Sequence, residues 1–307
     1  MKSGRNKTID LTVEQGAAYL ARCAAPGGEY LNRTILGDAI EALPLLPEGF
    51  VQLVIADPPY NLDTDFDGDS FRRVSDSEYR DYTRRWLSLV RPRMTDRASI
   101  YVCCDWRCSN VVAAALSECF TVRSRITWQR EKGRGAAKNW KNSMEDIWFA
   151  TVGRDYTFNL DAVKVRRRVR APYRAGGRPK DWTETAAGER YRDTCPGNFW
   201  DDVTVPYWSM PENTAHPAQK PEKLLAKLIL ASSEPGDVVM DPFLGSGSTA
   251  VTAKQLGRHF VGIEKNPRYL VWCEKRLELA ETEPGIQGYA DGVFWERNSF
   301  ALQKRKK

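Results

Sequence analysis

The sequence lacks the features that mark membrane, zinc-binding and disulfide-stapled proteins. No stretch of its 307 residues approaches the roughly 18 apolar residues that a membrane-spanning helix needs. It has only two histidines, His216 and His259, and its seven cysteines include no pair spaced as in a zinc site. The first 15 residues are polar and Arg22 interrupts the next apolar stretch, so we expect no signal peptide. These absences favour a cytoplasmic protein with reduced thiols, no membrane contact and no metal.

The charge of the chain is concentrated in one block. The chain has 46 basic and 40 acidic residues, a net charge of +6, and 42% hydrophobic residues, enough for a sizeable core. Residues 164–192 hold ten Lys and Arg residues against Asp181, Glu184 and Glu189, a local charge of +7, so the remainder is slightly acidic. Such a block indicates a surface that binds a polyanion, and a solvated basic loop is the alternative.

Hydrophobic periodicity predicts alternating strands and helices on both sides of one irregular segment. Strands are expected at 51–56, 99–103, 126–128, 144–150, 238–241 and 260–264. Helices are expected at 78–90, 110–119, 222–231 and 268–280, and another is expected to run from the glycine-rich loop to about 256. From about 153 to 211 the periodicity fails, and Arg, Pro, Gly and Trp dominate. The pattern predicts an α/β protein with a mostly parallel, doubly wound sheet and one irregular basic insertion.

A glycine-rich loop connects a predicted strand to a predicted helix. Asp241-Pro-Phe-Leu-Gly245-Ser-Gly247-Ser-Thr-Ala250 contains the spacing G-x-G-x-x-A, which allows a tight turn and a close approach of ligand to backbone. Glu264 ends the next strand, where a carboxylate can accept hydrogen bonds from ribose hydroxyls. The pattern indicates an adenosine-containing cofactor, and by itself it leaves a nicotinamide dehydrogenase open.

The motif Asp57-Pro58-Pro59-Tyr60 follows the strand at 51–56. An exocyclic amine of a nucleobase is a poor nucleophile because its lone pair is delocalised into the ring. A carboxylate and a backbone carbonyl held by the prolines can accept its two N–H groups, and Tyr60 offers a face for an extruded base. An ordinary proline-rich turn is the alternative reading of the motif.

Taken together, these motifs resemble the S-adenosylmethionine-dependent amino-methyltransferases of DNA. The order of catalytic motif, insertion and cofactor loop is similar to the circularly permuted β class, and the resemblance covers about 30–282. It includes Gly37-Asp38 and the element His216-Pro-Ala-Gln219-Lys220-Pro221, in which Ala218 replaces the usual Thr. The stretches 156–159 and 196–200 are similar to solitary bacterial adenine methyltransferases. The resemblance implies a Rossmann-like methyltransferase fold and S-adenosylmethionine as cofactor.

The resemblance also implies roles for individual residues. The target-base site would consist of Asp57, Pro58, Pro59 and Tyr60. The cofactor would be bound by Asp38, Gln219, Lys220, Asp241, Phe243, Gly245, Ser246, Gly247, Ser248, Thr249 and Glu264, with Gln219 and Lys220 near its carboxylate and Asp38 near its adenine. From the basic insertion we expect DNA contacts by Arg166, Arg167, Arg168, Arg170, Arg178, Lys180 and Asn198.

The implied activity is transfer of a methyl group to N6 of adenine in double-stranded DNA. The family usually carries DPPY for adenine and more often SPPY for cytosine-N4, so adenine is favoured. A cytosine-N4 or RNA-directed enzyme on the same fold is the alternative. A catalytically silent DNA-binding relative is the third possibility. Cytosine-C5 chemistry is excluded because the chain has no Pro-Cys pair. A bacterial or phage origin is implied, while a homodimer and a restriction endonuclease partner stay open. Five segments are expected: an N-terminal extension at 1–29, a catalytic half at 30–152, a target-recognition insertion at 153–213, a cofactor half at 214–282 and a tail at 283–307.

Overall fold

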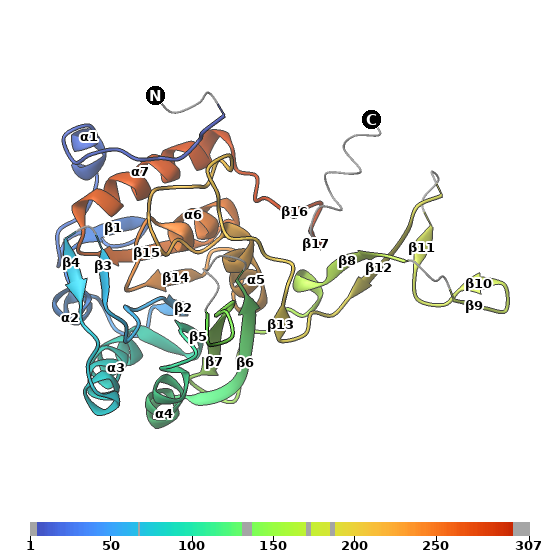
Figure 1. Cartoon of the computed structure of the whole chain (residues 1–307), viewed down its shortest axis with the longest axis horizontal. Helices are drawn as coiled ribbons and strands as arrows, with labels where there is room; N and C mark the ends of the chain where they lie inside the picture. The colour runs from blue at the N-terminus through green and yellow to red at the C-terminus, as the bar shows by residue number, and fades with distance from the viewer. Residues whose placement is uncertain (1–4, 67, 131–136, 170–172, 185–187, 297–307) are drawn as a thin grey trace.

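A large α/β sheet forms the centre of the protein (Figure 1). The computed structural model describes residues 5–66, 68–130, 137–169, 173–184 and 188–296. Eight strands are ordered β1-β15-β14-β2-β5-β7-β6-β13. They are β1 (Arg33–Leu36), β15 (His259–Glu264), β14 (Val238–Asp241), β2 (Val51–Ala56), β5 (Met94–Cys104), β7 (Met144–Thr151), β6 (Thr121–Gln129) and β13 (Phe199–Trp200). Among these, only β7 runs against its neighbours, which confirms the prediction of a mostly parallel sheet.

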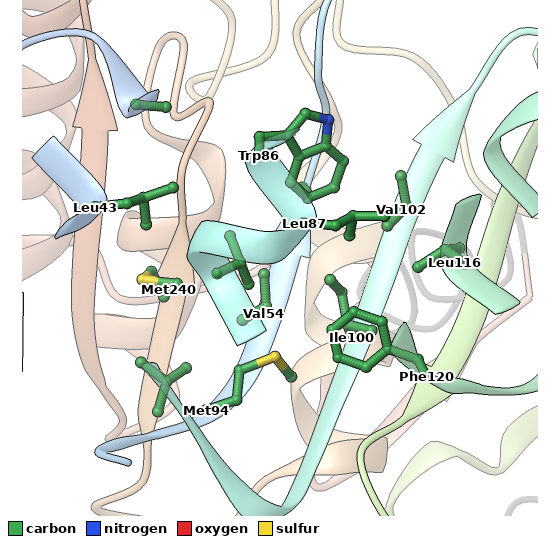
Figure 2. Close-up of a cluster of buried hydrophobic side chains, with 14 of the residues drawn as sticks. Leu43, Val54, Trp86, Leu87, Met94, Ile100, Val102, Leu116, Phe120 and Met240 are labelled. Atoms are coloured by element: carbon green, nitrogen blue, oxygen red, sulfur yellow. The ribbon is translucent and has the colours of Figure 1, made fainter. Parts of the chain in front are cut away.

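Helices cover both faces of this sheet. One face packs against α2 (Ala39–Ala42), α3 (Asp76–Val90) and α4 (Ser109–Cys119), and Figure 2 shows side chains of this layer meeting the strands. For example, Trp86 and Leu87 of α3 lie with Val54 of β2 and Ile100 of β5 in one buried cluster. The other face packs against α5 (Glu222–Ser232), α6 (Ser248–Gln255) and α7 (Pro267–Thr282), while the short α1 (Ala17–Leu20) contacts α7. No helix in the described part of the chain is long and apolar enough to cross a membrane.

Local signals explain where these elements begin and end. The Ser75 side chain accepts from the Glu78 N–H while Glu78 accepts from the Ser75 N–H, a capping box that starts α3. Pro58 and Pro59 end β2, because proline cannot donate to a sheet ladder. The strands β2 and β14 are far apart in sequence, yet they are parallel neighbours, with Val54 opposite Met240. Their carboxyl ends therefore deliver two loops to the same edge of the sheet.

The insertion contains regular structure, so the prediction that it is irregular is wrong in this respect. It holds β8 (Val165–Arg168), β9 (Arg174–Ala175), β10 (Arg178–Pro179), β11 (Thr183–Glu184) and β12 (Arg190–Thr194). A second sheet is ordered β11-β12-β8-β17-β16, and it extends away from the α/β body (Figure 1). These strands are short and mostly charged, so they lack the apolar alternation from which strands are predicted.

Two strands of this second sheet come from the C-terminal segment. They are β16 (Tyr289–Ala290) and β17 (Val293–Trp295), and β17 pairs in parallel with β8. Strands from the predicted insertion and from the predicted tail therefore belong to one sheet. A small hairpin of β3 (Thr64–Phe66) and β4 (Asp69–Phe71) follows the Asp57 motif.

Candidate active site

A cavity of about 380 Å³ lies at the carboxyl ends of the central strands. The motif after β2 and the glycine loop after β14 both line it, because the two strands are adjacent and parallel. All four residues predicted for the target-base site contribute to its wall. The residues predicted for the cofactor also line it, with the exception of Gly247: they are Asp38, Gln219, Lys220, Asp241, Phe243, Gly245, Ser246, Ser248, Thr249 and Glu264. The structure thus brings the two predicted half-sites into one cavity.

The carboxylate of Asp57 is held from two sides. The Tyr60 hydroxyl donates to Asp57 Oδ1 over 2.8 Å, and Lys220 Nζ lies 2.5 Å from Asp57 Oδ2. The Pro59 carbonyl accepts from the Tyr79 hydroxyl over 3.0 Å, which fixes the motif against α3. Burial raises the pKa of Tyr60 well above its ordinary value, so this phenol stays protonated and remains a donor.

A second carboxylate completes the surroundings of Lys220. Glu145 Oε2 lies 3.3 Å from Lys220 Nζ and 3.2 Å from the Tyr60 hydroxyl, and Arg130 forms an ion pair with Glu145 Oε1. Burial by itself would lower the pKa of Lys220, yet Asp57 and Glu145 raise it above its ordinary value. The lysine is therefore a cation bound between two carboxylates.

Sequence reasoning missed Glu145 and Arg130. Glu145 stands near the start of β7, and because β7 is antiparallel, that end of the strand meets the edge where β2 ends. The available signal was the pair Glu145-Asp146 inside an otherwise apolar strand, where both side chains are buried. A buried acidic residue in such a strand indicates a partner that the local sequence does not name.

The glycine loop is shaped by Asp241 and Glu264. Asp241 Oδ2 accepts from the Thr249 hydroxyl over 2.6 Å and Oδ1 accepts from the Phe243 N–H over 2.9 Å. Burial raises the pKa of Asp241 to about 7 and also raises the pKa of Glu264. The Glu264 carboxylate accepts from the backbone N–H groups of Gly245 and Asn266, each over 2.8 Å. Each oxygen of the Glu264 carboxylate has a second acceptor site, so Glu264 can still accept ribose hydroxyls.

The cavity fits an adenosine-bearing cation. Gly245 has a φ of +54°, and a Cβ there would lie 3.1 Å from His216 Nε2, so only glycine leaves this space open. Asp38 caps the N-terminus of α2 by accepting from the Ile40 N–H, and it lines the cavity together with Glu264. Carboxylates suit a ligand that offers ribose hydroxyls, an adenine amine and a positive sulfonium.

Gly247 and Gln219, which were predicted to bind the cofactor, instead make contacts within the protein. Gly247 does not line the cavity; its φ is +85°, and a Cβ would lie 2.1 Å from Cys273 Sγ, so this glycine allows α6 to pack on α7. Gln219 Oε1 accepts from the Thr214 N–H and hydroxyl, and its Nε2 donates to the Glu212 carbonyl over 2.7 Å. The carboxamide of Gln219 therefore holds the loop that carries His216 and Lys220.

Some basic residues of the insertion are exposed and others are ion-paired, and Arg192 is both, because it donates to Asp181 over 2.8 Å. Arg167 and Arg168 are exposed and, together with Lys180 and Arg192, line a shallow hollow of about 470 Å³ on the second sheet. Arg166 instead donates to both carboxylate oxygens of Asp193, over 2.8 and 2.7 Å.

The remaining predicted DNA contacts have different surroundings. Lys180 Nζ lies 5.6 Å from the centre of the Tyr173 ring. Asn198 Nδ2 donates to the Arg125 carbonyl over 2.9 Å, which anchors β13 at the sheet edge. Arg178 belongs to β10, and Arg170 lies outside the described residues.

Comparisons with known proteins agree with this geometry. The model of a DNA methylase family, N6_N4_Mtase, matches residues 51–275. The chain is 32% identical over 255 residues to DNA adenine methyltransferase YhdJ of Escherichia coli, with 82% of this chain and 85% of YhdJ covered. It is 31% identical over 250 residues to type II methyltransferase M.HpaI of Haemophilus parainfluenzae, with 80% and 74% covered.

Solved structures show the same fold. The M1.HpyAVI–SAM complex has a TM-score of 0.54 at 22% identity, with 80% of this chain and 98% of that chain covered. PvuII DNA methyltransferase, described as cytosine-N4-specific, has a TM-score of 0.61 at 17% identity, with 84% and 94% covered. The predictions of the fold, the family and its cofactor are therefore confirmed. The chain belongs to the DNA methylase family and is an S-adenosylmethionine-dependent DNA methyltransferase.

Proposed function

We propose that this protein methylates the exocyclic N6 of adenine at specific sites in double-stranded DNA. The observation that carries the proposal is that Asp57, which ends β2, and the glycine loop after β14 open into one cavity. The DPPY form of the motif and the name of the relative YhdJ, a DNA adenine methyltransferase, support adenine. The second candidate, cytosine-N4, is not favoured, because the likeness to PvuII methyltransferase at 17% identity concerns the fold alone.

The proposed chemistry depends on a hydrogen bond between Asp57 and the target amine. Its carboxylate accepts an N–H of the target amine and thereby localises the nitrogen lone pair toward the cavity. Tyr60 lines the same wall and offers an aromatic face to a base extruded from the duplex. When bound, S-adenosylmethionine supplies the electrophilic methyl group. Glu264 would hold its ribose, Asp38 would lie near its adenine, and the loop from Asp241 to Thr249 would surround its methionine part.

The insertion is proposed as the surface that recognises DNA. Its hollow, with Arg167, Arg168, Lys180 and Arg192, combines cationic side chains with the rings of Tyr173 and Trp182. Guanidinium groups suit phosphates, and the exposed phenol ring of Tyr173 suits the sugar–base surface, whereas Trp182 is buried beside Arg174 and Arg190. We therefore assign 153–213 to target recognition, joined by strands β16 and β17 of the C-terminal segment. Residues 30–152 and 214–282 form the catalytic and cofactor halves in this proposal.

Mass spectrometry of nucleosides tests the proposed function directly. Duplex DNA is incubated with the purified protein and S-adenosylmethionine, digested, and analysed for N6-methyladenine and N4-methylcytosine, with Asp57→Ala as the control. N6-Methyladenine in the wild-type reaction supports the proposal, and N4-methylcytosine replaces it with the second candidate. Absence of both bases, in a protein that binds S-adenosylhomocysteine, would indicate a silent relative. Sequencing with modified-base detection then gives the recognition site.

The cellular context follows from the substrate. Since both curated relatives are bacterial and the substrate is DNA, we place the protein in a bacterial cytoplasm. Size-exclusion chromatography tests the homodimer, and co-purification from the native host tests a restriction endonuclease partner.

A further inference from the structure

Lys220 lies at the centre of a closed set of polar contacts. Its ammonium group donates toward Asp57 Oδ2 at 2.5 Å, the Tyr60 hydroxyl at 3.1 Å and Glu145 Oε2 at 3.3 Å. Asp57 and Tyr60 accept hydrogen bonds from two of its three N–H donors, and Glu145 forms an ion pair with it. The contacts of the Lys220 ammonium group thus lie on the side of the cavity where the target base is proposed to bind.

The contacts form a chain of alternating charges. Arg130 pairs with Glu145, Glu145 with Lys220, and Lys220 with Asp57. The side chains of Lys220 and Glu145 are 7% and 4% exposed, whereas that of Asp57 is 21% exposed. Buried charges are stable only when paired, so removing one member leaves its neighbour uncompensated. Asp57 is the more exposed of the two carboxylates, and it lines the cavity.

We propose that Glu145 and Lys220 are positioning residues that fix the Asp57 carboxylate for the target amine, an inference that rests on the proposed function. Lys220 occupies one side of Oδ2 and Tyr60 one side of Oδ1, which sets the rotamer of Asp57 and directs its remaining lone pairs into the cavity. Glu145 keeps the ammonium in place from behind, and Arg130 holds Glu145. This assignment moves Lys220 from the cofactor's carboxylate, its predicted role, to the catalytic carboxylate.

The two roles of Lys220 predict opposite effects. If Lys220 positions Asp57, Lys220→Met lowers kcat by about 100-fold, as small misplacements of reacting groups do, while affinity for S-adenosylhomocysteine changes little. If it binds the cofactor's carboxylate, affinity for S-adenosylhomocysteine falls and kcat at saturating cofactor is kept. Glu145→Gln preserves the shape of the side chain and removes one carboxylate from Lys220, so it should lower kcat by about 10-fold, again without loss of cofactor affinity.

The experiment measures kcat at saturating DNA and cofactor together with calorimetric titration of S-adenosylhomocysteine. The matched control is Lys254→Met, a lysine of α6 that pairs with Glu281 at 2.7 Å and does not line the cavity; it should keep kcat. Lys220→Ala is also assayed with added methylamine, since partial recovery of kcat by a small ammonium requires a functional position and not merely a stable fold. Circular dichroism verifies that each variant is folded.

The outcomes separate this inference from the proposed function. Loss of kcat with kept cofactor affinity in Lys220→Met and Glu145→Gln supports the inference, as does recovery by methylamine. Weaker S-adenosylhomocysteine binding with unchanged kcat in Lys220→Met overturns it, and so does full turnover by a folded Glu145→Gln. If Lys220→Met does not fold, the Glu145→Gln result decides. A wild-type protein that methylates no DNA contradicts the proposed function instead.

Discussion

Replacing Arg167 and Arg168 together should weaken DNA binding through its salt dependence. Both side chains are exposed on β8 and line the hollow of the second sheet, whereas Arg166 is bound to Asp193 and lies 5.5 Å from the Trp295 ring. We therefore expect two phosphate contacts from this run of three arginines. The double substitution Arg167→Ala with Arg168→Ala tests them, and Arg166→Ala is the matched control.

The expected magnitude follows from counterion release. Each phosphate contact contributes about 0.9 to the slope of log affinity against log salt, so losing two should flatten the slope by about 1.8. If this term vanishes near about 1 M salt, affinity falls by about 30-fold at about 0.15 M and about 200-fold at about 0.05 M. The loss should be alike for cognate and unrelated duplexes, because phosphates carry no sequence information.

Fluorescence anisotropy of a labelled duplex, measured over a series of salt concentrations, gives the slope. The control Arg166→Ala should leave the slope unchanged and lower the free energy of unfolding by about 1 kcal/mol or less, as expected for a partly exposed ion pair. Titration with S-adenosylhomocysteine verifies that the cofactor half is intact in each variant. An unchanged slope in the double variant would refute the reasoning and place the DNA-binding surface elsewhere on the protein.

Three further predictions concern the cavity. Asp57→Ala should abolish methyl transfer while S-adenosylhomocysteine still binds, and Asp57→Asn should be nearly as damaging; more than about a tenth of wild-type turnover would contradict the role of a charged acceptor. Gly245→Val should remove cofactor binding by filling the space beside His216, whereas Glu264→Gln should weaken it by about 1.5–3 kcal/mol in calorimetry. Burial lowers the pKa of His216 from 6.5 to about 3, so the unfolded chain takes up this proton first. Its contribution to stability is present above about pH 6.5 and is lost as the pH falls toward 3, so His216→Gln should reduce this acid destabilisation. The pKa is measured by NMR titration of the imidazole signals, with His259→Gln used to assign them. Titration of His216 near 6.5 would contradict the prediction.

The central sheet could be predicted because its strands and helices carry strong periodicity. The predicted strand at 51–56 coincides with β2, and the predicted strand at 238–241 coincides with β14. The meeting of the Asp57 motif with the glycine loop was also predictable, since the carboxyl ends of strands in one parallel sheet share an edge.

The second sheet and the environment of Lys220 could not be predicted in this way. The strands β17 and β8 pair although more than a hundred residues separate them in the sequence. Neither strand has the alternation of apolar and polar residues from which a strand is predicted. Phe294 is fully buried, but only the tertiary structure shows that its surroundings include Val165 of β8. The contact between Lys220 and Asp57 joins residues separated by 163 positions. Local pattern identifies such residues as important without giving their partners.

The beginning of α5 connects the proposed recognition surface to the cavity. Lys223 donates to Asp202 Oδ2 over 2.9 Å and to the Trp295 carbonyl over 2.8 Å, and Lys227 donates to Asp202 Oδ1. Although burial acts in the opposite direction, the two lysines lower the pKa of Asp202 to about 2, so this buried carboxylate remains ionised. Trp295 belongs to β17, which pairs with β8, the strand that presents Arg167 and Arg168. Since Lys220 stands two residues before α5, the same short segment contacts both Asp57 and the base of the sheet that is proposed to recognise DNA.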